Sequence, residues 1–260
     1  MDVKLLSKNE HEISFLVKGT DAAFMNTLRR MILDEVPTMA IEWVEFKKND
    51  SVLYDEMVAH RLGLIPLKTD LKGYTVPDKC SCQGQGCAKC QATLTLKTKA
   101  QGMIESDKIK SKDPAIVPVY DTIPLTYLDG EQELEFAATA QLGRGKQHAK
   151  WSPGHAWFVQ EATVTVNTTS PKLAQFKDKY PQQIFDNQGK IDKNKIVEQS
   201  IIDACTGVCD DIIKIEYPEG NYSMFIESWG QLSSQEIVEA ALRELLAKLD
   251  DFKNLVQKID

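Results

Sequence analysis

Four cysteines lie close together in one short segment of this chain: Cys80, Cys82, Cys87 and Cys90. Thiolates bind Zn²⁺ in a tetrahedron, and a site with four sulfur ligands is structural because it leaves no open position for substrate. Gly84 and Gly86 would let the backbone turn tightly around an ion. An iron–sulfur cluster takes the same ligand type, but the C-x-C spacing fits the common cluster patterns poorly. We therefore expect a metal site with zinc as the favoured ion, and unligated thiols as the alternative.

A second pair of cysteines, Cys205 and Cys209, lies far along the chain. A bacterial-type ferredoxin run is C-x2-C-x2-C-x3-C-P, and its last two cysteines fall on this pair. Its first two cysteines fall on Gln199 and Ile202, so two of the four ligands are missing. The pair is therefore either two ordinary half-buried cysteines or the remnant of an iron–sulfur site, and an intact cluster is doubtful.

The composition is that of a folded, soluble protein, with 260 residues of which 42% are hydrophobic and 27% charged. No apolar stretch follows Met1, and no apolar run approaches the ~20 residues that span a bilayer. We expect a cytoplasmic protein without membrane contact, in which clustered cysteines are more often ligands than disulfides. The formal net charge of −7 argues against nucleic acid as the main partner, because phosphate binding requires a basic surface.

A basic segment at residues 142–157 is the other group of side chains with a possible specific role. It contains Arg144, Lys146, Lys150 and Trp151, and arginine and tryptophan are frequent anchors of protein interfaces. Its glycines lack the G-x4-G-K-[ST] spacing of a phosphate-binding loop. The segment is therefore an ordinary basic loop or a docking surface. The chain also contains no G-x-S-x-G, H-E-x-x-H or dinucleotide-binding motif, so we expect no active site of its own.

Strand and helix patterns surround these groups. Residues 1–18 alternate like a hairpin, and apolar residues at 24, 28, 31, 32 and 36 predict a helix that Pro37 ends. Residues 39–46 resemble a strand, and residues 53–67 a shorter helix. Short alternating runs with turn signals then indicate a β-rich region over about 67–170, followed by a polar stretch at 171–221.

The C-terminal segment is predicted to be a long helix after a strand at 223–230. Ser233 and Glu236 have the spacing of a capping box, in which both side chains satisfy free amides at the helix start. An apolar stripe then follows at steps of four and three: Val238, Leu242, Leu245, Leu249, Phe252, Val256 and Ile259. The stripe packs either on the sheet of this chain or against a second chain, because so long a helix can extend past a small domain.

Several of these segments together resemble the D subunits of archaeal RNA polymerases. This family is related to the third-largest subunit of eukaryotic RNA polymerase II and to the N-terminal region of the bacterial α subunit. The matching blocks run from one end of the chain to the other, at residues 26–37, 53–67, 80–90, 142–154 and 227–242. Their order and spacing together carry the resemblance.

The resemblance implies an α+β fold with three parts. Residues 1–50 and 222–260 would form a discontinuous dimerisation domain, a mixed sheet plus long helices. Residues 51–170 would form an inserted β-rich domain that holds the cysteines, and residues 171–221 a small, degenerate ferredoxin-like subdomain. The eukaryotic relatives carry a zinc site whose four ligands Cys80, Cys82, Cys87 and Cys90 match in order. Many archaeal relatives carry an iron–sulfur cluster in the subdomain, where only Cys205 and Cys209 remain here.

The function that the resemblance implies is a non-catalytic platform for the assembly of DNA-directed RNA polymerase. The chain would form a heterodimer with subunit L and then receive the second-largest subunit and the small subunits N and P. It would meet DNA only indirectly, through the complex. The implied dimer interface comprises Phe24, Leu28, Ile32, Val238, Leu242, Leu245, Leu249, Phe252 and Val256. The implied docking residues for the large subunits are Arg29, Arg30, Arg144, Lys146, Lys150 and Trp151.

Two other classes of protein remain as alternatives to the assembly subunit. The first is an iron–sulfur redox or electron-transfer protein that uses the cysteines. The second is a free-standing, zinc-stabilised nucleic-acid binder, which the acidic net charge disfavours.

Overall fold

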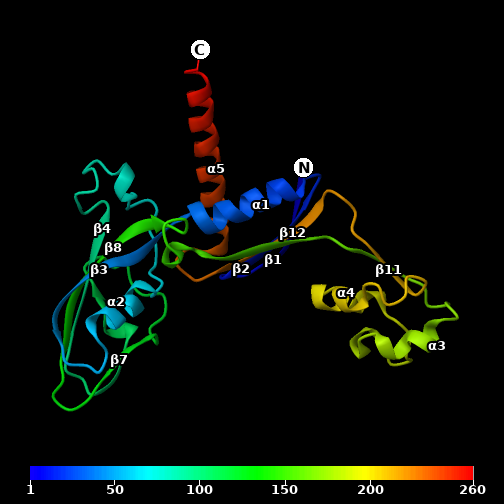
Figure 1. Ribbon diagram of the computed structural model, residues 1–260, viewed down its shortest axis with the longest axis horizontal. Helices are drawn as coiled ribbons and strands as arrows, with labels where there is room; N and C mark the ends of the chain where they lie inside the picture. The colour runs from blue at the N-terminus through cyan, green and yellow to red at the C-terminus, as the bar shows by residue number, and fades with distance from the viewer. Residues whose placement is uncertain (260) are drawn as a thin grey trace. The chain divides into compact units, whose positions relative to one another are not determined.

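The computed structural model describes residues 1–259, which form antiparallel sheets together with helices (Figure 1). The strands are β1 (Asp2–Lys8), β2 (Glu12–Lys18), β3 (Pro37–Asn49), β4 (Gln91–Thr98), β5 (Gly102–Glu105), β6 (Lys110–Ser111), β7 (Pro124–Leu128), β8 (Leu134–Arg144), β9 (Gly154–Gln160), β10 (Thr163–Val166), β11 (Ile213–Glu216) and β12 (Asn221–Ser228). The α-helices are α1 (Ala22–Arg30), α2 (Asp55–Gly63), α3 (Leu173–Phe176), α4 (Gln199–Cys205) and α5 (Ser234–Val256). This mixture of helices and antiparallel sheets confirms the α+β fold class.

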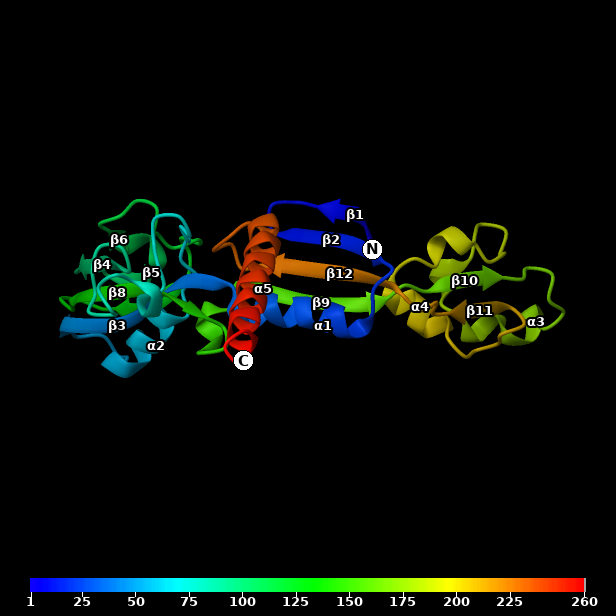
Figure 2. The same cartoon turned by 90° about the horizontal axis from the view of Figure 1, so that it is seen from above.

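The chain divides into two compact units. One contains Met1–Lys4, Leu16–Ala22 and Phe158–Ser223, and the other contains Leu5–Phe15, Ala23–Trp157 and the segment from Met224 onward. A four-stranded sheet has the order β1-β2-β12-β9, with β12 between β2 and β9 (Figure 2). Strand β2 is the second strand of the N-terminal hairpin that the sequence predicts.

The larger unit contains a second four-stranded sheet, in the order β3-β8-β4-β6. Strands β3 and β8 pair over their whole lengths, from Pro37 opposite Arg144 to Asn49 opposite Leu134, with register shifts near Trp43 and Lys48. One face of this sheet packs with α2 in an apolar core. The largest side chains of this core include Met39, Leu62, Leu94, Ile104 and Phe136. The predicted helix at residues 53–67 forms as α2 and stops at Gly63, and the β-rich middle region forms as this sheet and the pair β5-β7.

The smaller unit has a core of its own around the pair β10-β11. Buried Val164, Ile184 and Ile212 pack there with Cys205, while short helical turns connect them. Polar residues dominate the loops between these turns, which explains why the sequence pattern of residues 171–221 is weak.

The predicted N-terminal helix changes its type in the middle. Residues Ala22–Arg30 form an α-helix, but Met31–Glu35 form a π-helical turn before the strand that begins at Pro37. π-turns are rare and frequently occur at functional positions in helices. Apolar periodicity predicts that a helix exists here, but it cannot specify the wider turn.

Helix α5 begins as the sequence predicts. The amide of Glu236 donates to the hydroxyl of Ser233 at 3.3 Å, and the Glu236 carboxylate accepts from the amide of Ser233 at 2.9 Å. The hydrogen bonds from the hydroxyl and amide of Ser233 lower the pKa of Glu236, and they outweigh the opposing effect of burial. The first half of α5 is anchored by Ile237, Ala240 and Ala241, which are fully or almost fully buried.

Candidate metal centre and exposed helix face

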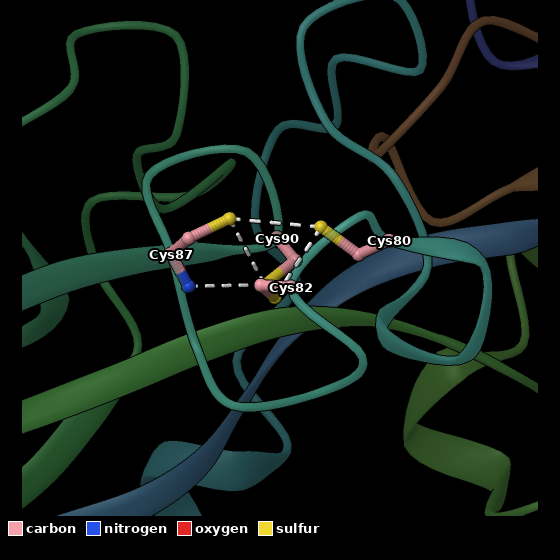
Figure 3. Close-up of side chains that lie close together, drawn as sticks. All are labelled: Cys80, Cys82, Cys87 and Cys90. Atoms are coloured by element: carbon pink, nitrogen blue, oxygen red, sulfur yellow. Dashed lines mark hydrogen bonds between the residues drawn. The ribbon is translucent and has the colours of Figure 1, made fainter.

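The four clustered cysteines lie in the loop that leads into β4, and their side chains converge (Figure 3). The sulfur of Cys82 lies 3.5 Å from those of Cys80 and Cys90, and the sulfur of Cys87 lies 3.6 Å from Cys80 and 3.8 Å from Cys90. All four sulfur atoms lie within 4.8 Å of one another. We call residues 79–90 the cysteine loop.

Consecutive turns bring these sulfurs together. The amide of Gln83 donates to the carbonyl of Cys80, and the amide of Cys90 donates to the carbonyl of Cys87, each at 2.9 Å. Gln83, Gly84 and Gly86 have positive φ angles of 53°, 80° and 87°. Glycine adopts this backbone region without a steric penalty, so the two glycines permit the reversal that the sequence suggested.

The arrangement fits a tetrahedral ion. Zinc–sulfur bonds of about 2.3 Å place neighbouring ligand sulfurs about 3.8 Å apart at the edges of a tetrahedron. Four of the six sulfur separations range from 3.5 to 3.8 Å. The amide of Cys87 also donates to the sulfur of Cys90 at 3.2 Å, which favours a thiolate at that position. The cysteine loop can therefore hold a metal ion with sulfur ligands alone.

The electrostatics of the four thiols are unequal. Interaction with the Cys80 thiol, and then with those of Cys90 and Cys87, lowers the pKa of Cys82 to about 6, although burial opposes this. Burial raises the pKa of Cys90 to about 12, although the Cys87 amide opposes that. One sulfur is therefore ready to bind as a thiolate at neutral pH, while a metal ion would have to displace the proton of another.

Hydrogen bonds join the cysteine loop, and the segment just before it, to the rest of the unit. The amide of Thr75 donates to the carbonyl of Lys89 at 2.8 Å. The hydroxyl of Tyr74 donates to a carboxylate oxygen of Asp113 at 2.6 Å. Between residues 70 and 90, Val76 is the one large aliphatic side chain that is buried. A metal ion would thus supply cohesion that the apolar side chains there do not.

The second cysteine pair does not form a comparable site. Cys205 is fully buried in the core of the smaller unit, and burial raises its pKa. Cys209 is half-buried, and its carbonyl accepts from the hydroxyl of Tyr180 at 3.2 Å. Within residues 1–259, no further cysteine, histidine or carboxylate joins this pair to make a group of three or more possible ligands. Cys205 has a structural role in the core.

The apolar stripe of α5 is largely exposed. Leu242 is 40% exposed, Leu249 55% and Phe252 66%, while Val238 and Leu245 are half-buried near the anchored half of the helix. The residues that anchor α5 to its unit lie on a different face of the helix from the stripe. At 3.6 residues per turn, the two faces are about a quarter turn apart. The first of the two predictions for the stripe, packing on a sheet of this chain, is therefore not what the structure shows.

Two exposed leucines on α5 are missing from the predicted stripe. Leu246 is 62% exposed and Leu255 is 61% exposed. A heptad template excludes both because they lie off its positions. The spacing of four residues between Leu242 and Leu246 was the signal that a broader apolar face was present.

The N-terminal part of the predicted dimer interface needs a correction. Leu28 is 4% exposed and Ile32 is fully buried, so their side chains form the core of the chain and offer no surface to a partner. Phe24 is half-buried. Helical periodicity identified the apolar face of this segment correctly, but it cannot tell an internal contact from an external one.

The predicted docking residues also separate into two groups. Trp151 is buried, and its indole donates to the carbonyl of Gln141 at 3.3 Å. The ammonium of Lys150 donates to the carbonyl of Ile41 at 3.0 Å, forms an ion pair with Glu42 and lies over the Trp151 ring. These two side chains stabilise the loop itself, which corrects their predicted role in docking.

The remaining docking candidates differ in exposure. Arg144 is mostly buried and forms ion pairs inside the chain, which makes it a poor candidate for docking. Arg29 is half-buried and donates to Asn26, at 2.8 and 3.1 Å. Arg30 and Lys146 are exposed, and both lie beside Asp34: Arg30 by an ion pair at 3.6 Å and Lys146 by its backbone amide at 3.0 Å.

No helix in residues 1–259 combines the length and apolar character needed to cross a membrane.

Comparison with known proteins finds relatives along the whole chain. Residues 44–155 match the family model described as the RNA polymerase Rpb3/RpoA insert domain. The chain is 34% identical to DNA-directed RNA polymerase subunit Rpo3 of Methanosphaera stadtmanae, over 99% of both chains. It is 36% identical to the protein of the same name from Pyrococcus horikoshii, over 99% of this chain and 98% of the relative. It is 30% identical to that of Archaeoglobus fulgidus, over 99% and 98%.

Proposed function

The chain belongs to the family of DNA-directed RNA polymerase subunit Rpo3, the archaeal D subunits, and we propose from this membership that it is a non-catalytic assembly subunit of that enzyme. The membership confirms the resemblance that the sequence suggested. It does not favour an iron–sulfur redox protein. The chain would work in the cytoplasm as part of a nucleotidyltransferase complex and would meet DNA only through that complex.

The exposed apolar face of α5 is the observation that carries this proposal. Soluble proteins rarely leave a contiguous row of large apolar side chains in water, and such rows mark interaction sites. Every residue from Leu246 to Ile259 is exposed, and Leu246, Leu249, Phe252, Leu255, Val256 and Ile259 are large and apolar. A partner helix that covers this face would bury area worth about 1.5–3 kcal/mol for each fully buried side chain.

The partner that fits this face is the smaller subunit L. Amphipathic helices pair when each presents an apolar row to the other. The proposed interface therefore consists of Val238, Leu242, Leu245, Leu249, Phe252 and Val256, to which the structure adds Leu246 and Leu255. From α1, half-buried Phe24 is also proposed to contact the partner.

Docking of the second-largest subunit is proposed for the basic surface around Asp34. Arg30 and Lys146 are exposed there, whereas Arg144, Lys150 and Trp151 have partners inside the chain. We expect the double variant Arg30→Glu, Lys146→Glu to pair normally with subunit L and to bind the second-largest subunit less. Unchanged recovery of that subunit in a pull-down of the assembled complex would contradict this docking site. The small subunits N and P would then join the same platform.

We propose that zinc occupies the cysteine loop, held by Cys80, Cys82, Cys87 and Cys90. A zinc ion with four sulfur ligands supplies cohesion rather than catalysis. The expected content is about one zinc per chain, measured by mass spectrometry of metals in the purified protein. Iron in place of zinc, with absorbance in the visible range, would contradict this assignment.

Co-expression with subunit L tests the assembly function. We expect wild-type chain and subunit L to elute together in size exclusion as one heterodimer. Leu249→Glu with Phe252→Glu should abolish this peak, because two charges would be buried without partners. Asn254→Glu is the matched control, because helical spacing places this exposed residue on the side of α5 away from the proposed interface, and it should leave the peak intact. Failure of the wild-type pair to associate would defeat the proposed function.

A further inference from the structure

Four charged side chains meet where α5 leaves the body of its unit: Glu35, Arg144, Glu244 and Lys248. We call them the charged cluster. Glu35 ends the π-helical turn, Arg144 ends strand β8, and Glu244 and Lys248 lie one turn apart on α5. Three elements that are distant in the sequence thus meet through ion pairs.

The guanidinium of Arg144 is the centre of the charged cluster. One of its terminal nitrogens contacts a carboxylate oxygen of Glu244 at 3.1 Å. Its Nε lies 3.3 Å from the carbonyl of Glu35 and 3.8 Å from the carboxylate of the same residue. The ammonium of Lys248 approaches the other carboxylate oxygen of Glu35 at 3.0 Å. Two carboxylates and two cations therefore balance one another.

Burial makes the loss of one partner from these ion pairs more costly than it is in ordinary surface pairs. The side chains of Arg144 and Glu35 are 16% and 13% exposed, and that of Glu244 is 23% exposed. Exposed ion pairs contribute little, whereas removing one partner of a mostly buried pair leaves an uncompensated charge. Glu35 and Glu244 would repel each other without the arginine between them.

The backbone beneath Arg144 is fixed. Arg144 pairs with Pro37 at the end of the β3–β8 ladder, and the amide of Lys146 donates to the carbonyl of Asp34 at 3.0 Å. Gly145 lies so close to the π-helical turn that a Cβ atom there would meet the carbonyl oxygen of Leu33 at 1.9 Å. The charged cluster therefore connects α5 to a rigid sheet and not to a loose loop.

The charged cluster is also the last attachment of α5 to its unit. The buried anchors of the helix end at Ala241, and Glu244 and Leu245 are half-buried, but every residue from Leu246 to Ile259 is exposed. Ion pairs at this point set the direction in which the exposed half of α5 projects. That half carries most of the apolar face proposed for subunit L.

We propose that Arg144 is a positioning residue for dimerisation, which holds the exposed half of α5 in the direction that the partner needs. This inference rests on the proposed function and adds to it a residue that orients the apolar face of α5. A preoriented helix binds more tightly because less conformational entropy is lost on association. Arg144 itself does not contact the partner.

A distance measurement in the full chain tests the positioning directly. Glu45 on β3 and Lys253 on α5 are exposed and would each be replaced by a keto amino acid that carries a spin label, which leaves the cysteines unlabelled. We expect one narrow distance distribution in the wild-type background and a broader one in Arg144→Met. Arg243→Met is the matched control, because its ion pair with Glu239 on the same helix is exposed. It should keep the narrow distribution.

Affinity for subunit L provides the second measurement. Arg144→Met should weaken binding about tenfold, which corresponds to about 1.4 kcal/mol. Arg144→Lys should fall between wild type and Arg144→Met, because an ammonium cannot contact Glu35 and Glu244 with the same geometry. Arg243→Met should bind like wild type, because Arg243 is exposed and does not belong to the proposed interface.

The outcomes separate this inference from the proposed function. An unchanged distance distribution in Arg144→Met, or equal broadening in Arg243→Met, overturns the positioning role. Unchanged affinity in Arg144→Met also overturns it. Absence of any binding by the wild-type chain defeats the proposed function, while the distance measurement still decides whether Arg144 orients α5. If Arg144→Met fails to fold, Glu244→Gln, which keeps the side-chain shape, replaces it and must broaden the distribution.

Discussion

At the scale of single residues, Tyr74 and Asp113 form the hydrogen bond that secures the segment before the cysteine loop. Burial, and then the hydrogen bond to Asp113, raise the pKa of Tyr74 to about 12. The same hydrogen bond is the largest cause of the lowered pKa of Asp113. The folded chain thus favours a protonated phenol beside an ionised carboxylate.

Replacing Tyr74 with phenylalanine should lower stability over a defined pH range. The depressed pKa of Asp113 gives stability that is present above its ordinary value of about 4 and is lost as pH falls. The raised pKa of Tyr74 gives stability that is present below about 10 and is lost as pH rises toward 12. Urea unfolding should therefore show a constant wild-type advantage from about pH 5 to 9 that shrinks on both sides. A pH-independent difference would contradict this.

Gly145 has no side chain, and this lets the basic loop pack closely against the π-helical turn. Gly145→Ala places a Cβ atom 1.9 Å from the backbone oxygen of Leu33, so the backbone must move. We expect a loss of about 1–3 kcal/mol in the free energy of unfolding, measured by urea denaturation. Gly63→Ala is the control, because its Cβ would meet the nearest atom at 3.7 Å. Equal losses in both variants would show that close packing is not the cause.

The sequence predicts some residue roles because they depend on local spacing. The four cysteines converge and the glycines between them turn the chain, as their spacing indicated. The roles of Lys150 and Trp151 could not be predicted, because their partners Ile41, Glu42 and Gln141 come from other strands. A basic, tryptophan-containing loop has the same composition whether its side chains face a partner or the interior.

At the scale of elements, α5 has an anchoring face and an exposed face with different tasks. The capping box, the helix and the apolar stripe could all be predicted, because they follow from contacts within a few residues. The anchors Ile237, Ala240 and Ala241 could not be distinguished from the stripe by hydropathy alone. The helix before β3 illustrates the same limit, since periodicity predicted a helix but neither its π-helical end nor the burial of Leu28 and Ile32.

The two faces of α5 should respond differently to truncation. Ile237→Ala removes a fully buried side chain and should cost about 2–5 kcal/mol of unfolding free energy in the isolated chain. Phe252→Ala should change that free energy by less than about 0.5 kcal/mol, because the ring is 66% exposed. Phe252→Ala should instead weaken binding to subunit L about tenfold or more. Denaturation and binding titrations of both variants measure this contrast, and a strongly destabilised Phe252→Ala would place the ring in the core.

At the scale of the whole molecule, the cysteine loop and the apolar face of α5 are separate devices. The loop is held by turns, two hydrogen-bonded neighbours and the proposed metal ion, whereas α5 is held by buried anchors and the charged cluster. The buried apolar core of the β3-β8-β4-β6 sheet contains no cysteine, so we expect it to form without a metal ion. An assembly subunit built in this way can be braced at one place and bind at another.

Metal removal should therefore loosen the cysteine loop and leave dimerisation nearly unchanged. After treatment with a strong chelator, trypsin should cleave faster at Lys79 and Lys89, which are exposed at the two ends of the loop. The affinity for subunit L should change by less than about threefold, because α5 keeps its anchors. Cys90→Ser should reproduce the faster cleavage, whereas Cys209→Ser, the matched control in the smaller unit, should retain the metal and the wild-type cleavage rate. Loss of the heterodimer on chelation would contradict this prediction. It would show that the metal-bound cysteine loop is needed to hold α5 in the position that the partner binds.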